Sequence, residues 1–231
     1  MYPSFIVEYG VSPHHLSSKV FLGIVEWLRT TRLDAKHSGR KLEADALKIV
    51  INRIYGALND AMDYLYDPEC TYTVTINLQL LLCNLIEAFE LNNFDVLSAN
   101  TDGLLVRLPI SRKDTFEHIC KEWEDYSKLT LETEKFEKYC RSAVNDYIAV
   151  GYGFYDALQE YNRCGVWIDS KGNTYTTRQA IEDKFIKFKG YFLQDPEYNK
   201  GFVYPVVKKA LKEYFLYGVD TVSYTHLTLP T

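Results

Sequence analysis

The feature that most constrains the fold of this chain is a predicted β-hairpin over residues 94–108, FDVLSANTDGLLVRL. Two apolar runs, 94–99 and 104–108, flank the polar sequence Asn100-Thr101-Asp102-Gly103. Apolar runs separated by a short turn rich in Asn, Asp and Gly are typical of antiparallel hairpins. A carboxylate at the tip of a rigid hairpin is well placed to hold Mg²⁺ together with substrate phosphates. The alternative is that Asp102 only forms the turn.

The rest of the chain predicts an α+β fold around this hairpin. Apolar residues at helical spacing predict helices over 17–37, 43–59, 71–91, 112–126 and 205–217. Strands are predicted at 129–136 and 143–150, which we expect to pair, and a second hairpin at 170–173. Residues 1–13 are expected to be a strand end and a loop, since Pro3 and Pro13 disfavour helix interiors. Together these elements predict an antiparallel sheet covered by helices on one face, with a two-helix hairpin beside it.

The two helices over 17–37 and 43–59 carry polar residues at helical spacing. In the first helix the apolar stripe is expected to consist of Val20, Ile24, Trp27, Leu28 and Leu33. Arg32 and Lys36 are four residues apart and share one face. In the second helix Lys48, Asn52 and Tyr55 form a polar stripe beside the apolar one. These stripes are either a binding surface for an anion or plain solvated faces.

Composition sets further limits. The 231 residues are 47% hydrophobic, which is enough for a buried core, and the net charge of −5 argues against a generally basic nucleic-acid binder. Five widely spaced cysteines without a C-x-x-C pattern predict reduced thiols and no structural metal. Met1 is not followed by a basic leader, and the most apolar run, 78–91, is too short to span a bilayer. We therefore expect a cytoplasmic protein with no membrane partner.

Three stretches, in this order, resemble the polymerase motifs of family B DNA polymerases. MYPS at 1–4 is similar to motif A (D-x-x-S-L-Y-P-S), KIVINRIYG at 48–56 to motif B (K-x-x-x-N-S-x-Y-G), and ANTDG at 99–103 to motif C (Y-G-D-T-D-S). The resemblance covers nearly the whole chain and implies part of a DNA-directed DNA polymerase with palm, fingers and thumb domains. It assigns 1–16 and 60–165 to the palm, 17–59 to the fingers, and 166–220 to the palm–thumb junction and a partial helical thumb.

The resemblance also implies the site residues. Asp102 would be a catalytic carboxylate and a ligand of a two-Mg²⁺ site. Tyr2 would pack under the sugar of the incoming deoxynucleoside triphosphate, and basic residues would hold its phosphates. The full nucleotide-binding set is Tyr2, Arg32, Lys36, Lys48, Asn52 and Tyr55. Contacts to primer–template DNA would come from Gly56, Thr101, Tyr147, Lys187 and Lys189.

The chain also departs from the family pattern. The motif A aspartate would lie before Met1, Asn100 replaces the first aspartate of motif C, and Arg53 replaces a serine of motif B. Val144 and Asn145 replace two lysines expected before Tyr147. We therefore expect little polymerase activity from this chain alone. Residues 221–231 resemble a translated sequencing adapter, and we expect them to lie outside the fold.

Two other interpretations stay open. A non-catalytic, palm-like nucleic-acid-binding module predicts no magnesium dependence and aromatic stacking on an open sheet face. A reverse transcriptase also has a palm, but the Tyr-Pro-Ser start and the motif B helix favour family B. Within that family, the N-T-D-G turn favours a bacteriophage replication enzyme.

Overall fold

The computed structural model describes residues 2–100, 103–143, 146–190 and 205–219, and the chain divides into two compact units. Unit 1 is Met1–Leu131 and unit 2 is Glu132–Thr231. Asp102 and Thr101, the adapter-like tail, and the two replaced lysine positions fall outside the described residues. Each unit is described below by itself.

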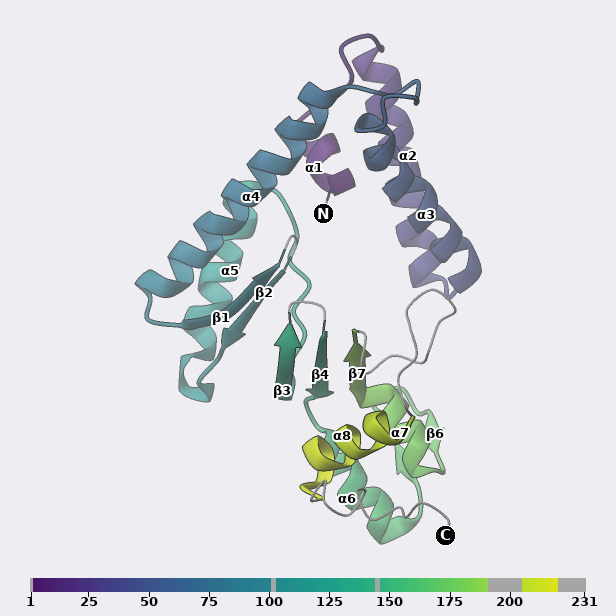
Figure 1. Cartoon of the computed structure of the whole chain (residues 1–231), viewed down its shortest axis with the longest axis vertical. Helices are drawn as coiled ribbons and strands as arrows, with labels where there is room; N and C mark the ends of the chain where they lie inside the picture. The colour runs from purple at the N-terminus through teal and green to yellow at the C-terminus, as the bar shows by residue number, and fades with distance from the viewer. Residues whose placement is uncertain (1, 101–102, 144–145, 191–204, 220–231) are drawn as a thin grey trace, which may run out of the picture. The chain divides into compact units, whose positions relative to one another are not determined.

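Unit 1 is mainly helical (Figure 1). Its elements, in chain order, are α1 (Tyr2–Glu8), α2 (Ser18–His37), α3 (Lys41–Leu58), α4 (Pro68–Leu91), β1 (Asp95–Asn100), β2 (Gly103–Arg107), a 3₁₀ turn (Ile110–Arg112) and α5 (Lys113–Ser127). Helices α2 and α3 lie side by side. The link between them contains Gly39, whose φ of 73° lies in the left-handed region that favours glycine. The two predicted helices and the predicted hairpin of strands are confirmed.

The core of unit 1 is built on α4. Asp67 caps this helix, accepting a hydrogen bond from the backbone N–H of Cys70 at 3.0 Å, and Pro68 occupies the first turn. The buried face of α4 includes Val74, Leu78, Leu85 and Phe89, which pack with buried residues of α1, α2 and α5. The indole N–H of Trp123 on α5 donates to the carbonyl of Leu81 at 2.9 Å. This core holds α1, α2 and α5 against one helix.

Unit 2 is a three-stranded antiparallel sheet with helices. Its elements are β3 (Phe136–Ala143), β4 (Asp146–Gly151), α6 (Phe154–Cys164), β5 (Trp167–Ile168), β6 (Thr174–Tyr175), α7 (Arg178–Phe185), β7 (Ile186–Lys189) and α8 (Pro205–Tyr217). The strand order is β3–β4–β7, and β5 pairs with β6 as the predicted second hairpin. Ile148, Val150 and Ile186 from the sheet pack with α6, α7 and α8 in one buried cluster (Figure 1).

Two predicted elements and the expectation of a single sheet are wrong. Residues 2–8 are helical, because Pro3 lies in the first turn, where its missing N–H costs no hydrogen bond. Residues 129–135 form no strand: their alternation arises because Leu129 and Leu131 pack into the core of unit 1 from an irregular segment. The strand that pairs with β4 is Phe136–Ala143. The described strands also form three separate sheets rather than one.

The buried face of α2 differs from the prediction. Phe21, Val25 and Leu28 are buried, whereas Val20, Ile24 and Trp27 are 60%, 52% and 62% exposed. Both sets recur at helical spacing, so periodicity alone could not choose between them. The prediction also missed two helices, α6 and α7. Helix α6 ends at Gly165, which has φ 73°.

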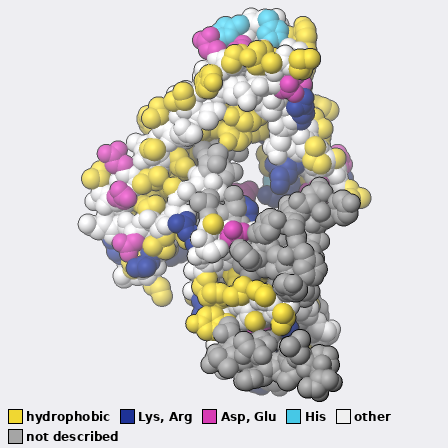
Figure 2. Space-filling model, viewed as in Figure 1, with side chains coloured by type: hydrophobic (Ala, Val, Ile, Leu, Met, Phe, Trp, Pro, Cys, Tyr) yellow, Lys and Arg dark blue, Asp and Glu magenta, His cyan; other side chains and the backbone are white. Residues whose placement is uncertain are grey.

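Helix α4 begins three residues earlier than predicted, and an 18-residue window within it has a mean hydropathy of 1.4, so its apolar stretch is longer than the run 78–91. Among the described residues, α4 is long and apolar enough to cross a membrane, judged by length and composition only. That is a weak indication, because core helices meet the same test and one face of α4 forms the core of unit 1. Figure 2 shows that hydrophobic side chains also gather along the visible surface of this helix. Three large hydrophobic residues of α4 are exposed: Tyr72, Ile76 and Leu80.

Candidate functional site

A pocket of about 340 Å³ lies in unit 1 where α1, α2 and α3 meet. Its volume falls in the range of small-molecule sites. The lining residues come from the start of α1, the second half of α2 and the middle of α3: Tyr2, Pro3, Arg32, Lys48, Ile51, Asn52 and Tyr55. Among these seven residues two are cationic and none is acidic, so the pocket suits an anionic ligand.

The geometry of α3 explains how one helix supplies most of this lining. Lys48, Asn52 and Tyr55 are spaced four and three residues apart, so they project from one face. Ile51 is 5% exposed and forms an apolar part of the wall next to them. The polar stripe predicted from the sequence therefore faces a pocket and not only solvent.

One wall of the pocket is aromatic. The rings of Tyr2 and Tyr55 stack with centroids 4.1 Å apart and an interplanar angle of 6°. The Tyr55 hydroxyl lies 2.7 Å from the hydroxyl of Thr75 on α4. Because Thr75 donates its own proton to the carbonyl of Thr71, Tyr55 donates to Thr75. This bond fixes Tyr55, and Tyr55 in turn supports the Tyr2 ring.

The cationic side of the pocket is formed by Arg32 and Lys48. Arg32 is half-buried, and its Nε is a buried nitrogen with no hydrogen-bond partner among the described residues. Lys48 is exposed on the neighbouring helix. A buried donor without a partner costs free energy, and an anionic ligand would satisfy it. The two charges and this open donor favour a phosphate or carboxylate ligand.

The structure brings together five of the six predicted nucleotide-binding residues. The sixth, Lys36, is exposed one turn beyond Arg32 on α2 and does not line the pocket. Gly56 is exposed on α3, and a Cβ there would meet only the Arg53 side chain, at 3.9 Å. Within the described residues nothing requires a glycine at this position. Arg53 itself bonds Asp63 at 2.8 Å and does not line the pocket.

The predicted catalytic carboxylate cannot be placed in this site. Asp102 and Thr101 lie outside the described residues, next to the pair Asn100–Gly103 that closes the β1–β2 ladder. The family resemblance implies that Asp102 and Lys48 face the same cleft, and this stays a prediction. Among the described residues, no three His, Cys, Asp or Glu side chains are grouped so that they could hold a metal ion.

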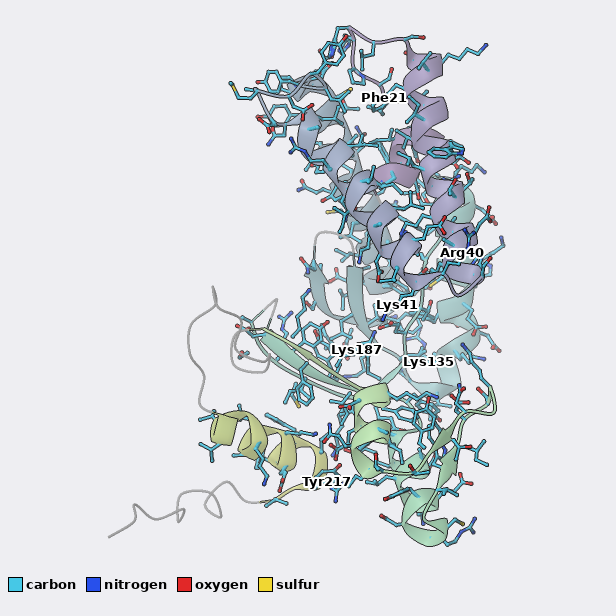
Figure 3. The ribbon with its side chains drawn as sticks, turned by 90° about the vertical axis from the view of Figure 1, so that its right-hand side faces the viewer. Phe21, Arg40, Lys41, Lys135, Lys187 and Tyr217 are labelled. Atoms are coloured by element: carbon cyan, nitrogen blue, oxygen red, sulfur yellow. The ribbon has the colours of Figure 1, made fainter. Side chains whose placement is uncertain are left out.

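The other predicted DNA-binding residues lie in unit 2. Tyr147 is on β4, and Lys187 and Lys189 are on β7, where Lys189 pairs directly with Tyr147. The two lysines are exposed and Tyr147 is half-buried. Figure 3 labels Lys187 at this sheet, away from α8. Both lysines therefore project from a paired strand.

Sequence analysis missed two residues that line the pocket and one that supports its wall. Pro3 and Ile51 line it, and Thr75 bonds Tyr55 from a helix twenty residues further along the chain. Pro3 follows Tyr2 in α1, and Ile51 precedes Asn52 in α3, so both lie next to predicted residues. Nothing in the sequence pairs Thr75 with Tyr55.

No family model matches the chain. The chain is 28% identical over 177 residues to a DNA polymerase from Thermococcus gorgonarius, covering 60% of this chain and 23% of that protein. It is also similar to the solved family B DNA polymerase from Pyrobaculum calidifontis, with 18% identity, a TM-score of 0.49, and coverage of 66% and 25% of the two chains.

The chain is therefore similar to part of a DNA polymerase, and it spans about a quarter of the length of the two proteins it matches. Both relatives are archaeal, so the expected bacteriophage source gains no support.

Proposed function

We propose that this chain is part of a family B DNA polymerase and that the pocket between α1, α2 and α3 binds the incoming deoxynucleoside triphosphate. The observation that carries the proposal is the convergence of Tyr2, Arg32, Lys48, Asn52 and Tyr55 on one anion-favouring pocket. These residues come from two of the three motifs and from the helix between them. The similarity to a DNA polymerase supports the same assignment.

In this proposal each wall of the pocket has its own task. Arg32 and Lys48 bind the phosphates and offset their negative charge, and the open Nε of Arg32 donates to a phosphate oxygen. The stacked ring of Tyr2 lies under the sugar, where its position would exclude a 2′-hydroxyl. Gly56 leaves space for the new base pair to approach α3.

The reaction proposed for the whole enzyme is template-directed nucleotidyl transfer. The primer 3′-hydroxyl attacks the α-phosphate of the bound nucleotide, and pyrophosphate leaves. The residues of this chain contribute by positioning the nucleotide and by electrostatic stabilisation. Mg²⁺ is the proposed divalent ion, and Asp102 is its proposed ligand. In the same proposal α2 and α3 belong to the fingers, β1 to β4 belong to the palm, β5 to β7 belong to the palm–thumb junction, and α8 belongs to the thumb. Tyr147, Lys187 and Lys189 contact DNA.

Nucleotide binding by the purified chain tests the pocket. Changing Lys48 to Gln removes one phosphate contact, so we expect about tenfold weaker binding of a magnesium-bound deoxynucleoside triphosphate, measured by calorimetry. The matched control is Lys19→Gln, which removes an exposed charge of α2 that does not line the pocket. Equal affinities of the K48Q and K19Q variants would contradict the proposal.

Primer extension separates a polymerase from a non-catalytic nucleic-acid-binding module. We expect this chain to bind nucleotide and DNA but to extend a primer little, because the motif A aspartate is not among its residues. In a longer protein that contains both this chain and that aspartate, Asp102→Asn should abolish magnesium-dependent extension. A neutral effect of this change would favour the non-catalytic module.

A further inference from the structure

The aromatic wall of the pocket is anchored to a helix that does not line the pocket. Tyr55 of α3 is a lining residue, and its hydroxyl lies 2.7 Å from the hydroxyl of Thr75 on α4. Helix α1, which carries Tyr2, contacts both α3 and α4 and lies between them in Figure 1. The position of the wall therefore depends on a residue outside the pocket.

Thr75 is an acceptor that the core of unit 1 holds in place. Its hydroxyl donates to the carbonyl of Thr71, one turn earlier on α4, at 2.8 Å. Because that proton is committed, the Thr75 oxygen accepts the proton of the Tyr55 hydroxyl. Thr71 and Val74 on either side of this turn are buried, and Val74 packs in the core of unit 1. The core, and not the ligand pocket, fixes the acceptor.

The hydrogen bond acts on Tyr2 through ring stacking. The Tyr55 ring is held at its hydroxyl end and faces the Tyr2 ring at 4.1 Å, with an angle of 6° between the planes. Both rings are half-buried and pack against the core of unit 1. Closely packed groups transmit displacements to their neighbours. A shift of the Tyr55 ring therefore shifts the support of the Tyr2 ring.

Discrimination between two sugars is sensitive to such a shift. In the proposed function the Tyr2 ring lies under the sugar, and a single oxygen atom distinguishes a ribonucleotide from a deoxyribonucleotide. The groups of a binding site must be held within about 0.5 Å of their working positions. When Tyr55 loses its hydroxyl anchor, the deoxyribonucleotide loses packing under its sugar, whereas the ribonucleotide loses a clash.

We propose that Thr75 is a positioning residue that sets the preference of the pocket for deoxyribonucleotides over ribonucleotides. It acts through its hydrogen bond to Tyr55 and the stack on Tyr2, and it does not line the pocket itself. Thr75 also lies outside the three polymerase motifs, between 48–56 and 99–103. The proposal rests on the proposed function, because it takes a nucleoside triphosphate as the ligand and Tyr2 as the residue under its sugar.

The test compares two ligands of the purified chain by calorimetry: a magnesium-bound deoxynucleoside triphosphate and the ribonucleoside triphosphate with the same base. The readout is the dissociation constant of the ribonucleotide divided by that of the deoxyribonucleotide. Thr75→Val keeps the size of the side chain but removes the acceptor, so this ratio should fall about fivefold, as expected for the loss of one buried hydrogen bond. Thr75→Ser keeps the hydroxyl and should keep the ratio.

Two further variants isolate the route of the effect. Thr30→Val is the matched control, because the exposed Thr30 makes the same kind of bond to a carbonyl one turn earlier, on α2, and does not line the pocket. It should leave the ratio unchanged. Tyr55→Phe removes the same hydrogen bond from its other side and should lower the ratio by the same factor. In the Y55F background, T75V should then cause no further fall.

A lower ratio in T75V and Y55F, with wild-type ratios in T75S and T30V, supports the proposal. If circular dichroism shows that T75V does not fold, Y55F carries the test, and an unchanged ratio in Y55F overturns the proposal. Weaker binding of both nucleotides by one factor in T75V would mean that Thr75 is only structural; this also overturns the proposal but leaves the nucleotide pocket intact.

Two other results count against the proposal without touching the proposed function. One is a further fall of the ratio when T75V is added to Y55F, because Thr75 would then act by another route. The other is a wild-type chain that binds both nucleotides equally well. If the wild-type chain binds neither nucleotide, the proposed function fails, and this proposal fails with it.

Discussion

Changing Glu182 to Gln tests how α8 is attached to unit 2. Glu182 on α7 is buried, with a side chain 7% exposed, and it accepts hydrogen bonds from Lys212 and Tyr217 of α8. Arg178 also donates to it, at 3.2 Å, and lies over the Tyr217 ring at 3.8 Å. Figure 3 shows Tyr217 at the end of α8, beside α7. Glutamine keeps the shape of the side chain but removes the charge that three partners share.

The expected cost can be estimated from these exposures. Breaking a buried ion pair by removing one partner costs about 3–5 kcal/mol. Here Lys212 is 18% exposed and Arg178 is 50% exposed, so solvent screens part of the interaction. We expect a loss of about 2 kcal/mol, which for a chain of this length lowers Tm by about 4–8 °C.

The pH dependence gives the sharper check. Burial alone would raise the pKa of Glu182, but the hydrogen bonds from Lys212 and Tyr217 bring it below its ordinary value of 4.5. A lowered pKa in the folded state means that the charge stabilises the fold above pH 4.5 and that this contribution is lost as pH falls through the folded pKa.

The assay is thermal unfolding of wild type and E182Q at several pH values, with Glu160→Gln, an exposed position on α6, as control. The difference between wild type and E182Q should be full at pH 7 and should shrink below about pH 4. A difference that is the same at pH 7 and pH 3, or no larger than that of E160Q, would refute this account of Glu182.

Three further predictions concern unit 1. Asp67→Ala should lower the free energy of unfolding by about 1–2 kcal/mol through loss of the α4 cap. Despite burial, hydrogen bonds hold the pKa of Asp67 at about 2. The difference in unfolding free energy between wild type and variant, measured by denaturant melts, should therefore disappear between about pH 4 and pH 2. Thr75→Val should cost about 1 kcal/mol and weaken nucleotide binding, while Thr75→Ser should do neither, because only valine leaves the Tyr55 hydroxyl without its partner. Gly56→Ala should stabilise α3 by about 0.5–1 kcal/mol but reduce primer–template binding; unchanged DNA affinity would show that nothing approaches this glycine.

Much of the helical structure could be predicted because local signals agree with the fold. The helices over 17–37 and 43–59 and the hairpin around Asn100 have both periodicity and turn residues, and all three form. The errors came where one pattern fits two structures. The alternation around Leu129 reflects packing of an irregular segment, and two adjacent apolar stripes compete on α2. Burial, which periodicity does not report, decides such cases.

The sequence by itself determined which residues of the pocket carry charge and that Lys48, Asn52 and Tyr55 share a helix face, because spacing along a helix is a local property. Only the tertiary structure decided that Tyr2 stacks on Tyr55 and that Arg32 faces the same pocket. It also decided that Lys189 lies beside Tyr147, which depends on strand register. These contacts join residues that are far apart along the chain. They depend on how the core packs and how the strands pair, and no short stretch of sequence specifies either.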